Sequence, residues 1–194
     1  GLNPDRVLFF GNGLASGWGV ASHELAVPGE LARSLSAITG RGVDIDVSAH
    51  VDLKVAGAVR ALEERELSGY DAIVVIFGAG DALSLTPRAK WRASMRALIE
   101  MLADRTSASA RIVVVAQSSI RAVPPFDNLF GRVANSHAAT LNAITRELCE
   151  AQPKVEYLTL PPTTAPATDR LGTPERYRAF GRFIALQLAS HLDD

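Results

Sequence analysis

Cysteine is almost absent from this chain, and the single residue of this type is Cys149. One thiol excludes an internal disulfide, and its helical surroundings offer no basic pocket that would activate it, so we expect Cys149 to be inert. The sequence also has no His-x-x-x-His or Cys-x-x-Cys spacing. We therefore expect neither a metal site nor a cofactor.

An excess of charge of either sign is also missing. The 20 lysine and arginine residues are balanced by 21 aspartate and glutamate residues, which gives a net charge of −1. This balance argues against nucleic acid or an anionic membrane surface as the main partner. Apolar runs are short, and none approaches the ~18 residues that a membrane-spanning helix needs. We expect no membrane span, and a small molecule or a protein as partner, with the oligomeric state left open.

The composition is that of a globular protein, with 47% hydrophobic and 21% charged residues in a chain of 194. This length suits one core, so residues 1–194 are predicted to form a single domain. The chain starts Gly1-Leu2-Asn3, without an initiator methionine or a signal segment, which favours a domain from a longer or processed protein. The compartment stays open, although the lack of disulfides and of a signal segment favours the cytoplasm.

Runs typical of strands alternate with runs typical of amphipathic helices five times along the chain. Strands are predicted at 7–10, 43–47, 72–77, 111–116 and 155–160. Helices are predicted at 28–38, 54–67, 87–102 (with Thr86 as N-cap), 133–148 and 174–192. Such alternation implies right-handed crossovers. The predicted fold class is α/β, a three-layer α/β/α sandwich with a five-stranded parallel sheet in flavodoxin-like order, the first strand near the centre.

The stretch from Arg6 to Val20 is the most informative loop of the sequence. The apolar run 7–10 stops at Gly11, and further glycines follow at positions 13, 17 and 19. This is how a buried strand passes into a loop whose backbone is accessible for binding. In a parallel sheet, ligands bind outside the carboxyl ends of the strands, where this loop meets the others. The candidate site is therefore expected at that edge.

Three motifs carry a resemblance to a known family. They are Val7-Leu-Phe-Phe-Gly-Asn-Gly-Leu-Ala-Ser-Gly-Trp-Gly19, Phe77-Gly-Ala-Gly-Asp81 and Asp169-Arg-Leu-Gly172. In order and spacing the chain resembles the GDSL, or SGNH, hydrolases over nearly its whole length. These are three-layer α/β esterases, lipases and carbohydrate or lipid deacylases, so the resemblance implies the SGNH-hydrolase fold.

The resemblance also assigns a role to each motif position. In the family, a serine attacks the acyl carbonyl, a histidine takes its proton, and an aspartate three residues earlier orients the histidine. The serine amide, a glycine and an asparagine hold the oxyanion. This sequence has Asn12 for the aspartate before the serine, and it keeps Asp169. At the nucleophile, glycine, asparagine and histidine positions it has Gly13, Leu53, Gly80 and Gly172.

No catalytic residue is therefore expected, and the sequence predicts a catalytically silent domain that acts in ligand binding, regulation or partner docking. The ligand-binding cleft would be lined by residues from the loops at the carboxyl edge of the sheet: Asn12, Gly13, Trp18, His50, Gly80, Asp81 and Ser118.

Enzymatic alternatives remain open. A hydrolase with relocated groups would use Ser16, Ser118 or Ser119 as nucleophile, His50 or His23 as base and Asp52 or Asp81 as orienting acid. Loop serines more commonly cap turns, and scattered histidines are more often surface residues than catalytic ones.

Binding and structural alternatives also remain. The run Gly11-Asn-Gly-Leu-Ala-Ser-Gly17 is one step from a dinucleotide-binding fingerprint, with Asp46 at the end of strand two as the ribose-binding acid. However, helix signals wait until Pro28, too late to aim a helix at a pyrophosphate. The glycines could also be turn residues of an unrelated α/β domain, and a purely structural domain would fill the cleft with Leu53 and Trp18.

Two further features are interpreted as structural. His137 lies on an apolar helical stripe and is predicted to be a histidine at the edge of the core. Four basic residues lie on the polar side of one predicted helix and are expected to form a solvated face rather than a binding patch: Arg88, Lys90, Arg92 and Arg96.

Overall fold

The computed structural model describes residues 4–12, 27–120, 126–161 and 174–192. Five strands form one parallel sheet in the order β2-β1-β3-β4-β5. Their bounds are Asp5–Gly11 (β1), Val43–Ala49 (β2), Ala72–Ile76 (β3), Arg111–Val115 (β4) and Val155–Leu158 (β5). The predicted fold class is confirmed, including the inner position of β1.

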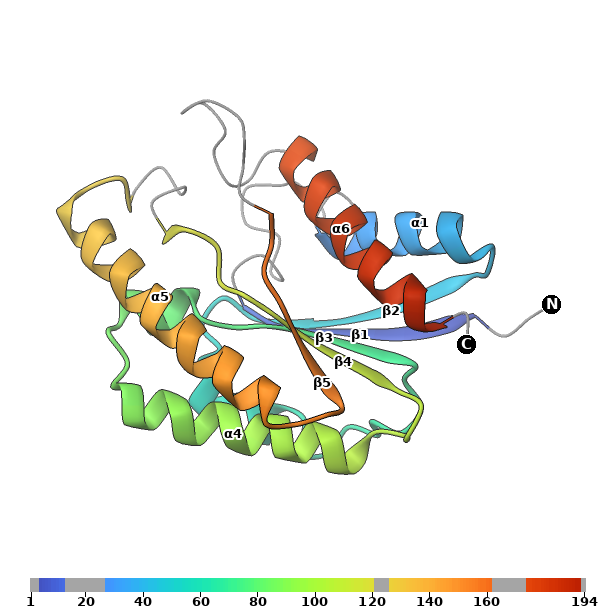
Figure 1. Cartoon of the computed structure of the whole chain (residues 1–194), viewed down its shortest axis with the longest axis horizontal. Helices are drawn as coiled ribbons and strands as arrows, with labels where there is room; N and C mark the ends of the chain where they lie inside the picture. Colours follow the sequence, from blue (N-terminus) through green and yellow to red (C-terminus); the bar gives the residue numbers. More distant parts are fainter. Residues whose placement is uncertain (1–3, 13–26, 121–125, 162–173, 193–194) are drawn as a thin grey trace.

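Helices cover both faces of this sheet, as Figure 1 shows. On one face lie α1 (Val27–Thr39) and α6 (Pro174–Leu192). The other face carries the long helices α4 (Arg88–Arg105) and α5 (Leu129–Glu150). It also carries three short elements: the 3-10 helix η3 (Val55–Gly57), α2 (Ala58–Ala61) and α3 (Ala79–Leu83). Within the described ranges, no helix is long and apolar enough to cross a membrane.

The strand sequences explain the two cores. Side chains alternate across a sheet, so Leu8 and Phe10 enter the core under α4 and α5, whereas Val7 and Phe9 enter the core under α1 and α6. Every residue of β3 is buried, as expected for an inner strand with helices on both faces. Full burial of one large apolar side chain contributes ~1.5–3 kcal/mol to stability. The two cores therefore hold the strands firmly in place, and with them the loops that follow their carboxyl ends.

The helix predicted at 54–67 is wrong. The segment forms only η3 and the single turn of α2, and the chain then continues through turns to the start of β3. Hydrogen bonds from Arg105 of α4 stabilise the non-helical conformation of this segment. Its guanidinium donates to the carbonyl oxygens of Leu62 (3.2 Å) and Arg65 (2.7 Å), which satisfies acceptors that helical amides would otherwise pair.

Two predicted helix starts also differ from the structure. Thr86 does not cap α4: the helix begins at Arg88 after Pro87, and the Thr86 hydroxyl donates to Asp81 instead. The fourth predicted helix begins at 129 rather than 133, because the Asn128 side chain accepts a hydrogen bond from the Gly131 amide and caps the first turn.

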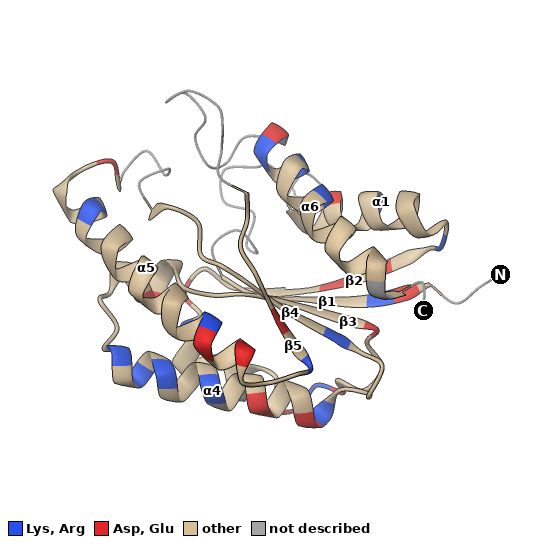
Figure 2. Ribbon diagram, in the orientation of Figure 1, with Lys and Arg blue, Asp and Glu red and all other residues tan. Residues whose placement is uncertain are grey.

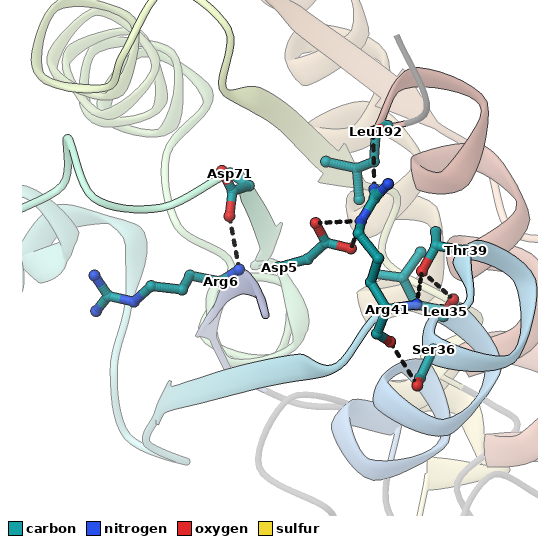
Figure 3. A network of polar contacts seen from close by, with 8 residues as sticks. All are labelled: Asp5, Arg6, Leu35, Ser36, Thr39, Arg41, Asp71 and Leu192. Carbon is teal, nitrogen blue, oxygen red and sulfur yellow. Dashed lines mark hydrogen bonds and ion pairs between the residues drawn. The ribbon is translucent and has the colours of Figure 1, made fainter. Parts of the chain in front are cut away.

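A polar network ties the amino-terminal end of the sheet to the end of α6 (Figure 3). Arg41 Nε lies 3.1 Å from both carboxylate oxygens of Asp5, and the same guanidinium donates to the Leu192 carbonyl oxygen at 2.8 Å. A cation at the last helical carbonyl also suits the negative end of the helix dipole. This network lies opposite the carboxyl edge and is structural.

Figure 2 places the basic residues of the first half of α4 on its outer surface. Arg88, Lys90 and Arg96 are exposed, and Arg92 forms a bidentate pair with Glu147 at 2.8 Å. The prediction of a solvated face is confirmed. His137 is half-buried, with Nε2 lying 2.8 Å from the Thr86 carbonyl oxygen, in agreement with a histidine at the edge of the core.

Candidate functional site

The parallel strands bring the predicted loops to one edge of the sheet. Asn12 follows β1, His50 follows β2, Gly80 and Asp81 follow β3, and Ser118 follows β4. Backbone hydrogen bonds join the first three loops: the Asn12 amide donates to the Ile76 carbonyl oxygen (2.8 Å), and the His50 amide donates to that of Gly11 (3.1 Å). The positions of Gly13, Trp18, Asp169 and Gly172 lie outside the described residues, as do Ser16 and His23.

Asn12 is a buried polar residue at the carboxyl edge of the sheet. Its side chain is fully buried, and Nδ2 donates to the Leu53 carbonyl oxygen at 2.6 Å. Its Oδ1 is buried and has no hydrogen-bond partner among the residues that the structure describes. The residue therefore fastens the loop after β1 to the loop after β2. Leu53 itself is half-buried and packs against the core under α4 and α5.

Gly80 lies beside Asn12. A Cβ atom added at Gly80 would sit 3.6 Å from Asn12 Nδ2, which is ordinary van der Waals contact. The turn before it is tighter: Gly78 has φ +135°, and a Cβ there would lie 2.9 Å from Cβ of Gln117. The turn after β3 thus packs against the loop after β4 through a residue that has to be glycine.

Asp81 is fully buried, and both of its carboxylate oxygens are used. Oδ2 accepts a hydrogen bond from the Val55 amide at 3.2 Å, and Oδ1 accepts one from the Thr86 hydroxyl at 3.0 Å. The carboxylate therefore joins the start of η3 to the segment before α4. Its contacts hold loops in place and leave no oxygen facing an open cleft.

The described candidates for a relocated triad are not assembled. His50 is exposed, Ser118 is half-buried, and the Ser119 hydroxyl donates to Asn135 Oδ1 at 2.9 Å. Asp52 is exposed in the loop after β2. Among the residues that the structure describes, no serine hydroxyl forms a hydrogen bond with a histidine.

Asp46 does not occupy the position that a ribose-binding acid would need. The prediction placed it at the end of strand two, but β2 continues through Ala49, so Asp46 lies in mid-strand. It accepts a hydrogen bond from the Tyr70 hydroxyl and lies 3.6 Å from Arg65 NH1. The dinucleotide-binding interpretation therefore lacks its ribose-binding acid, and most of the glycine run lies outside the described residues.

Cys149 lies on the buried face of α5, and burial, with a smaller contribution from Glu150, raises the pKa of its thiol to about 12. The reactive thiolate is therefore scarce at neutral pH, in agreement with the expected inertness.

A pocket of about 540 Å³ opens where β4 and β5 end. It is lined from the loop after β4, from α5, from β5 and the residues after it, and from α6. Its polar and aromatic lining residues are Gln117, Ser118, Ser119, Asn142, Arg146, Tyr157, Thr159, Arg176 and Phe180. Sequence reasoning identified only Ser118 as a site residue and weighed Ser119 as a nucleophile. The spacing of Asn142 and Arg146, four residues apart on one helix face, was the available signal for α5.

The sheet and its carboxyl-edge loops define a three-layer α/β domain of the kind that binds substrates or ligands outside its strand ends. The chain belongs to the GDSL-like Lipase/Acylhydrolase family, whose sequence profile matches residues 9–192. No curated protein sequence matches it.

Solved structures agree with this assignment at the level of the fold. Est24, a carbohydrate acetylesterase from Sinorhizobium meliloti, is 18% identical, with a TM-score of 0.74, over 96% of this chain and 99% of that one. The native M. smegmatis aryl esterase is 16% identical, with a TM-score of 0.76 and the same two coverages. The lipase Lip_vut3 from a goat rumen metagenome is 12% identical, with a TM-score of 0.72, over 96% and 98%.

Replacing Asn12 with aspartate, the residue of the family motif, should lower the free energy of unfolding by about 2 kcal/mol at neutral pH. The new carboxylate would oppose the Leu53 carbonyl oxygen and would have no partner, so burial would raise its pKa above the unfolded value of ~3.9. Because the pKa of this new carboxyl is higher in the folded protein than in the unfolded chain, the stability lost to the substitution grows as pH rises from the unfolded pKa through the folded one.

Urea unfolding of N12D at pH ~4.5 and pH ~7.5 would measure this difference against the unmodified protein. Asn128→Asp is the matched control, because a carboxylate caps the start of α5 as well as an amide does. A loss of stability that is the same at both pH values would contradict the buried-charge explanation.

Proposed function

We propose that this chain is a catalytically silent member of its family that binds a small molecule or a protein partner at the carboxyl edge of the sheet. One observation carries the proposal: glycine stands at Gly13, Gly80 and Gly172, where the family resemblance places the nucleophile, the oxyanion asparagine and the base. Glycine can neither attack an ester nor accept a proton through a side chain. A single oxyanion donor is worth ~2.7–4 kcal/mol, so the joint loss leaves no usual route to an acyl-enzyme.

The neighbouring polar groups support the proposal because they already have structural roles. Asn12 lies beside Gly80, but it is buried and its amide nitrogen is bonded to Leu53. Asp81 uses both oxygens to hold Val55 and Thr86. Neither residue is placed to replace an oxyanion donor or an orienting acid without giving up a buried hydrogen bond.

The competing function is ester hydrolysis with relocated catalytic residues. It is favoured by the activities named for the structural neighbours, a carbohydrate acetylesterase and an aryl esterase. In this alternative, Ser118 or Ser119 would attack and His50 would move to accept the proton, which requires the exposed imidazole to reach across the edge of the sheet.

Turnover of p-nitrophenyl acetate and butyrate tests the two functions. We expect the unmodified protein to show no saturable turnover, and the variants Ser16→Ala, Ser118→Ala and Ser119→Ala to behave identically to it. The triple variant Gly13→Ser, Gly80→Asn, Gly172→His is the comparison, since position 80 has room for a Cβ. Saturable turnover that disappears in one serine variant would overturn catalytic silence and establish the competing function.

A further inference from the structure

Large apolar side chains are exposed together at the start of α5 and in the turn before α4. Leu129 is 68% exposed, and Phe130 and Val133 are each 48% exposed. Leu85, in the turn that follows α3, is 45% exposed. These four make up half of the exposed large apolar residues in the part of the chain that the structure describes. Single exposed apolar residues need no explanation, but a cluster of them marks a contact surface.

The two segments lie against each other. His137 Nε2 lies 2.8 Å from the Thr86 carbonyl oxygen, so the turn before α4 touches α5. Val133 precedes His137 by one helical turn, and Leu129 precedes Val133 by another, which places all three on one side of α5. The starts of α4 and α5 also lie on the same side of the molecule in Figure 1. The exposed side chains therefore form one surface, here called the apolar strip: Leu85, Leu129, Phe130 and Val133.

The backbone of Leu85 supports a binding role for the apolar strip. Leu85 has φ +50°, the one positive value that the described residues show outside glycine. This left-handed conformation is unfavourable for a bulky side chain, and glycine or asparagine is more usual there. Burial of the side chain does not offset the strain, because Leu85 is exposed. A contact made by the leucine itself accounts for its presence at a strained position.

Arginines flank the apolar strip at both ends. Arg132 is the neighbour of Val133 on α5, and Arg88 is the first residue of α4, three residues after Leu85. Both are exposed, and neither forms an ion pair with another residue that the structure describes. Arg88 keeps its place in the solvated face of α4, because charges at the rim of an interface stay partly hydrated. A partner with carboxylates on either side of an apolar segment would complement this surface in charge as well as in polarity.

An anionic lipid surface fits the apolar strip less well than a protein does. Asp127 is exposed two residues before Leu129, and a carboxylate there would be repelled by anionic headgroups. The strip contains neither tryptophan nor tyrosine, the residues enriched at membrane surfaces. The whole chain has a net charge of −1, which gives no general attraction to such a surface. A protein can place its carboxylates beside the arginines and avoid Asp127.

We infer that the apolar strip docks an acidic amphipathic segment of a partner protein. The apolar side chains of that segment cover the strip, and its carboxylates lie beside Arg88 and Arg132. The strip follows the carboxyl ends of β3 and β4 along the chain, so it belongs to the edge that the proposed function assigns to binding. The inference rests on that proposed function and names the class of partner.

Fluorescence anisotropy of a labelled acidic peptide tests the inference. The probe is an amphipathic peptide of ~14 residues, with leucine on one helical face and glutamate and alanine on the other. We expect binding that saturates below ~1 mM and weakens as salt is added. Leu129→Ser should weaken this binding by about tenfold, and Arg132→Gln by about threefold. Both side chains are exposed, so the urea midpoint of each variant should stay unchanged.

Matched controls come from α6, outside the apolar strip. Leu186 is 49% exposed and Arg182 is also exposed, so Leu186→Ser and Arg182→Gln remove the same kinds of side chain elsewhere. Both variants should bind the peptide as the unmodified protein does. A second peptide, with lysine in place of glutamate and the same leucines, should bind at least about tenfold more weakly.

Each other outcome overturns the inference. Absence of saturation, equal binding of the two peptides, or equal weakening by Leu186→Ser would exclude an acidic docking segment on the apolar strip. Binding to phosphatidylcholine vesicles that contain phosphatidylserine, lost in Leu129→Ser and without peptide binding, would assign the strip to a membrane surface instead. The p-nitrophenyl ester assay is a separate measurement, so catalytic silence can stand or fail whatever the peptide titration shows.

Discussion

Gly11→Ala should cost at least about 4 kcal/mol of unfolding free energy, the largest effect that we predict for a single methyl group. Gly11 is the last residue of β1 and has φ +142°, a conformation that side chains rarely adopt. A Cβ at this position would lie 1.8 Å from the carbonyl oxygen of Ile76. That oxygen accepts the Asn12 amide, so relief of the collision would break the joint between β1 and β3.

Urea unfolding followed by circular dichroism would measure this cost. Gly40→Ala is the control, because Gly40 also has positive φ (+68°) but has nothing within 4 Å of an added Cβ. The control should lose only ~1–2 kcal/mol from its backbone conformation. If the two variants were equally stable, the end of β1 would be free to move away from Ile76, and the collision would not be the cause.

Asp81→Ala should destabilise the fold by about 3 kcal/mol. The substitution removes the acceptors of the Val55 amide and of the Thr86 hydroxyl, both in a fully buried setting. An unpaired buried donor costs ~1–3 kcal/mol, and loss of a hydrogen bond to a charged group a similar amount. The loop after β2 should loosen first, because Val55 begins η3.

Denaturant unfolding and hydrogen exchange of the Val55 amide would test the prediction together. Asp81→Asn should retain most of the stability, since its oxygen can still accept from Val55 while its amide donates to the Thr86 hydroxyl oxygen, which is free to rotate. Asp52→Ala, in the same loop but exposed, should have no measurable effect. Slow exchange of Val55 in Asp81→Ala would contradict the anchoring role.

The strands could be predicted from sequence because their signal is local. The β-branched runs at β3 and β4 are bounded by glycine or polar residues, and burial on both faces requires continuous apolar composition. The segment 54–67 has the apolar periodicity of a helix, but the prediction of a helix there was wrong. A distant residue, Arg105, donates hydrogen bonds to two of its carbonyl oxygens, which therefore need no helical partners. Periodicity cannot reveal such a partner, which lies 40 residues away in the chain.

Some features of the candidate site could also be predicted from sequence and others could not. The location of the loops at one edge follows from the alternation of strands and helices alone, because this alternation implies a parallel sheet. The fixed amide of Asn12 and the buried carboxylate of Asp81 do not, because their partners Leu53 and Val55 are 41 and 26 residues away in the chain. The pocket between α5 and α6 was missed because its walls come from four separate segments.

The sequence by itself determined the α/β class, the family motifs and the three glycines at Gly13, Gly80 and Gly172, because each is a property of residue type and local order. Only the tertiary structure decided that Gly80 lies against Asn12, that Asp81 is an anchor, and that Arg146 and Arg176 line one pocket. Those facts depend on how loops and helices pack across the sheet edge. That packing is determined by long-range hydrogen bonds and by the shapes of the side chains in contact. The periodicity of apolar residues along the sequence contains no information about either.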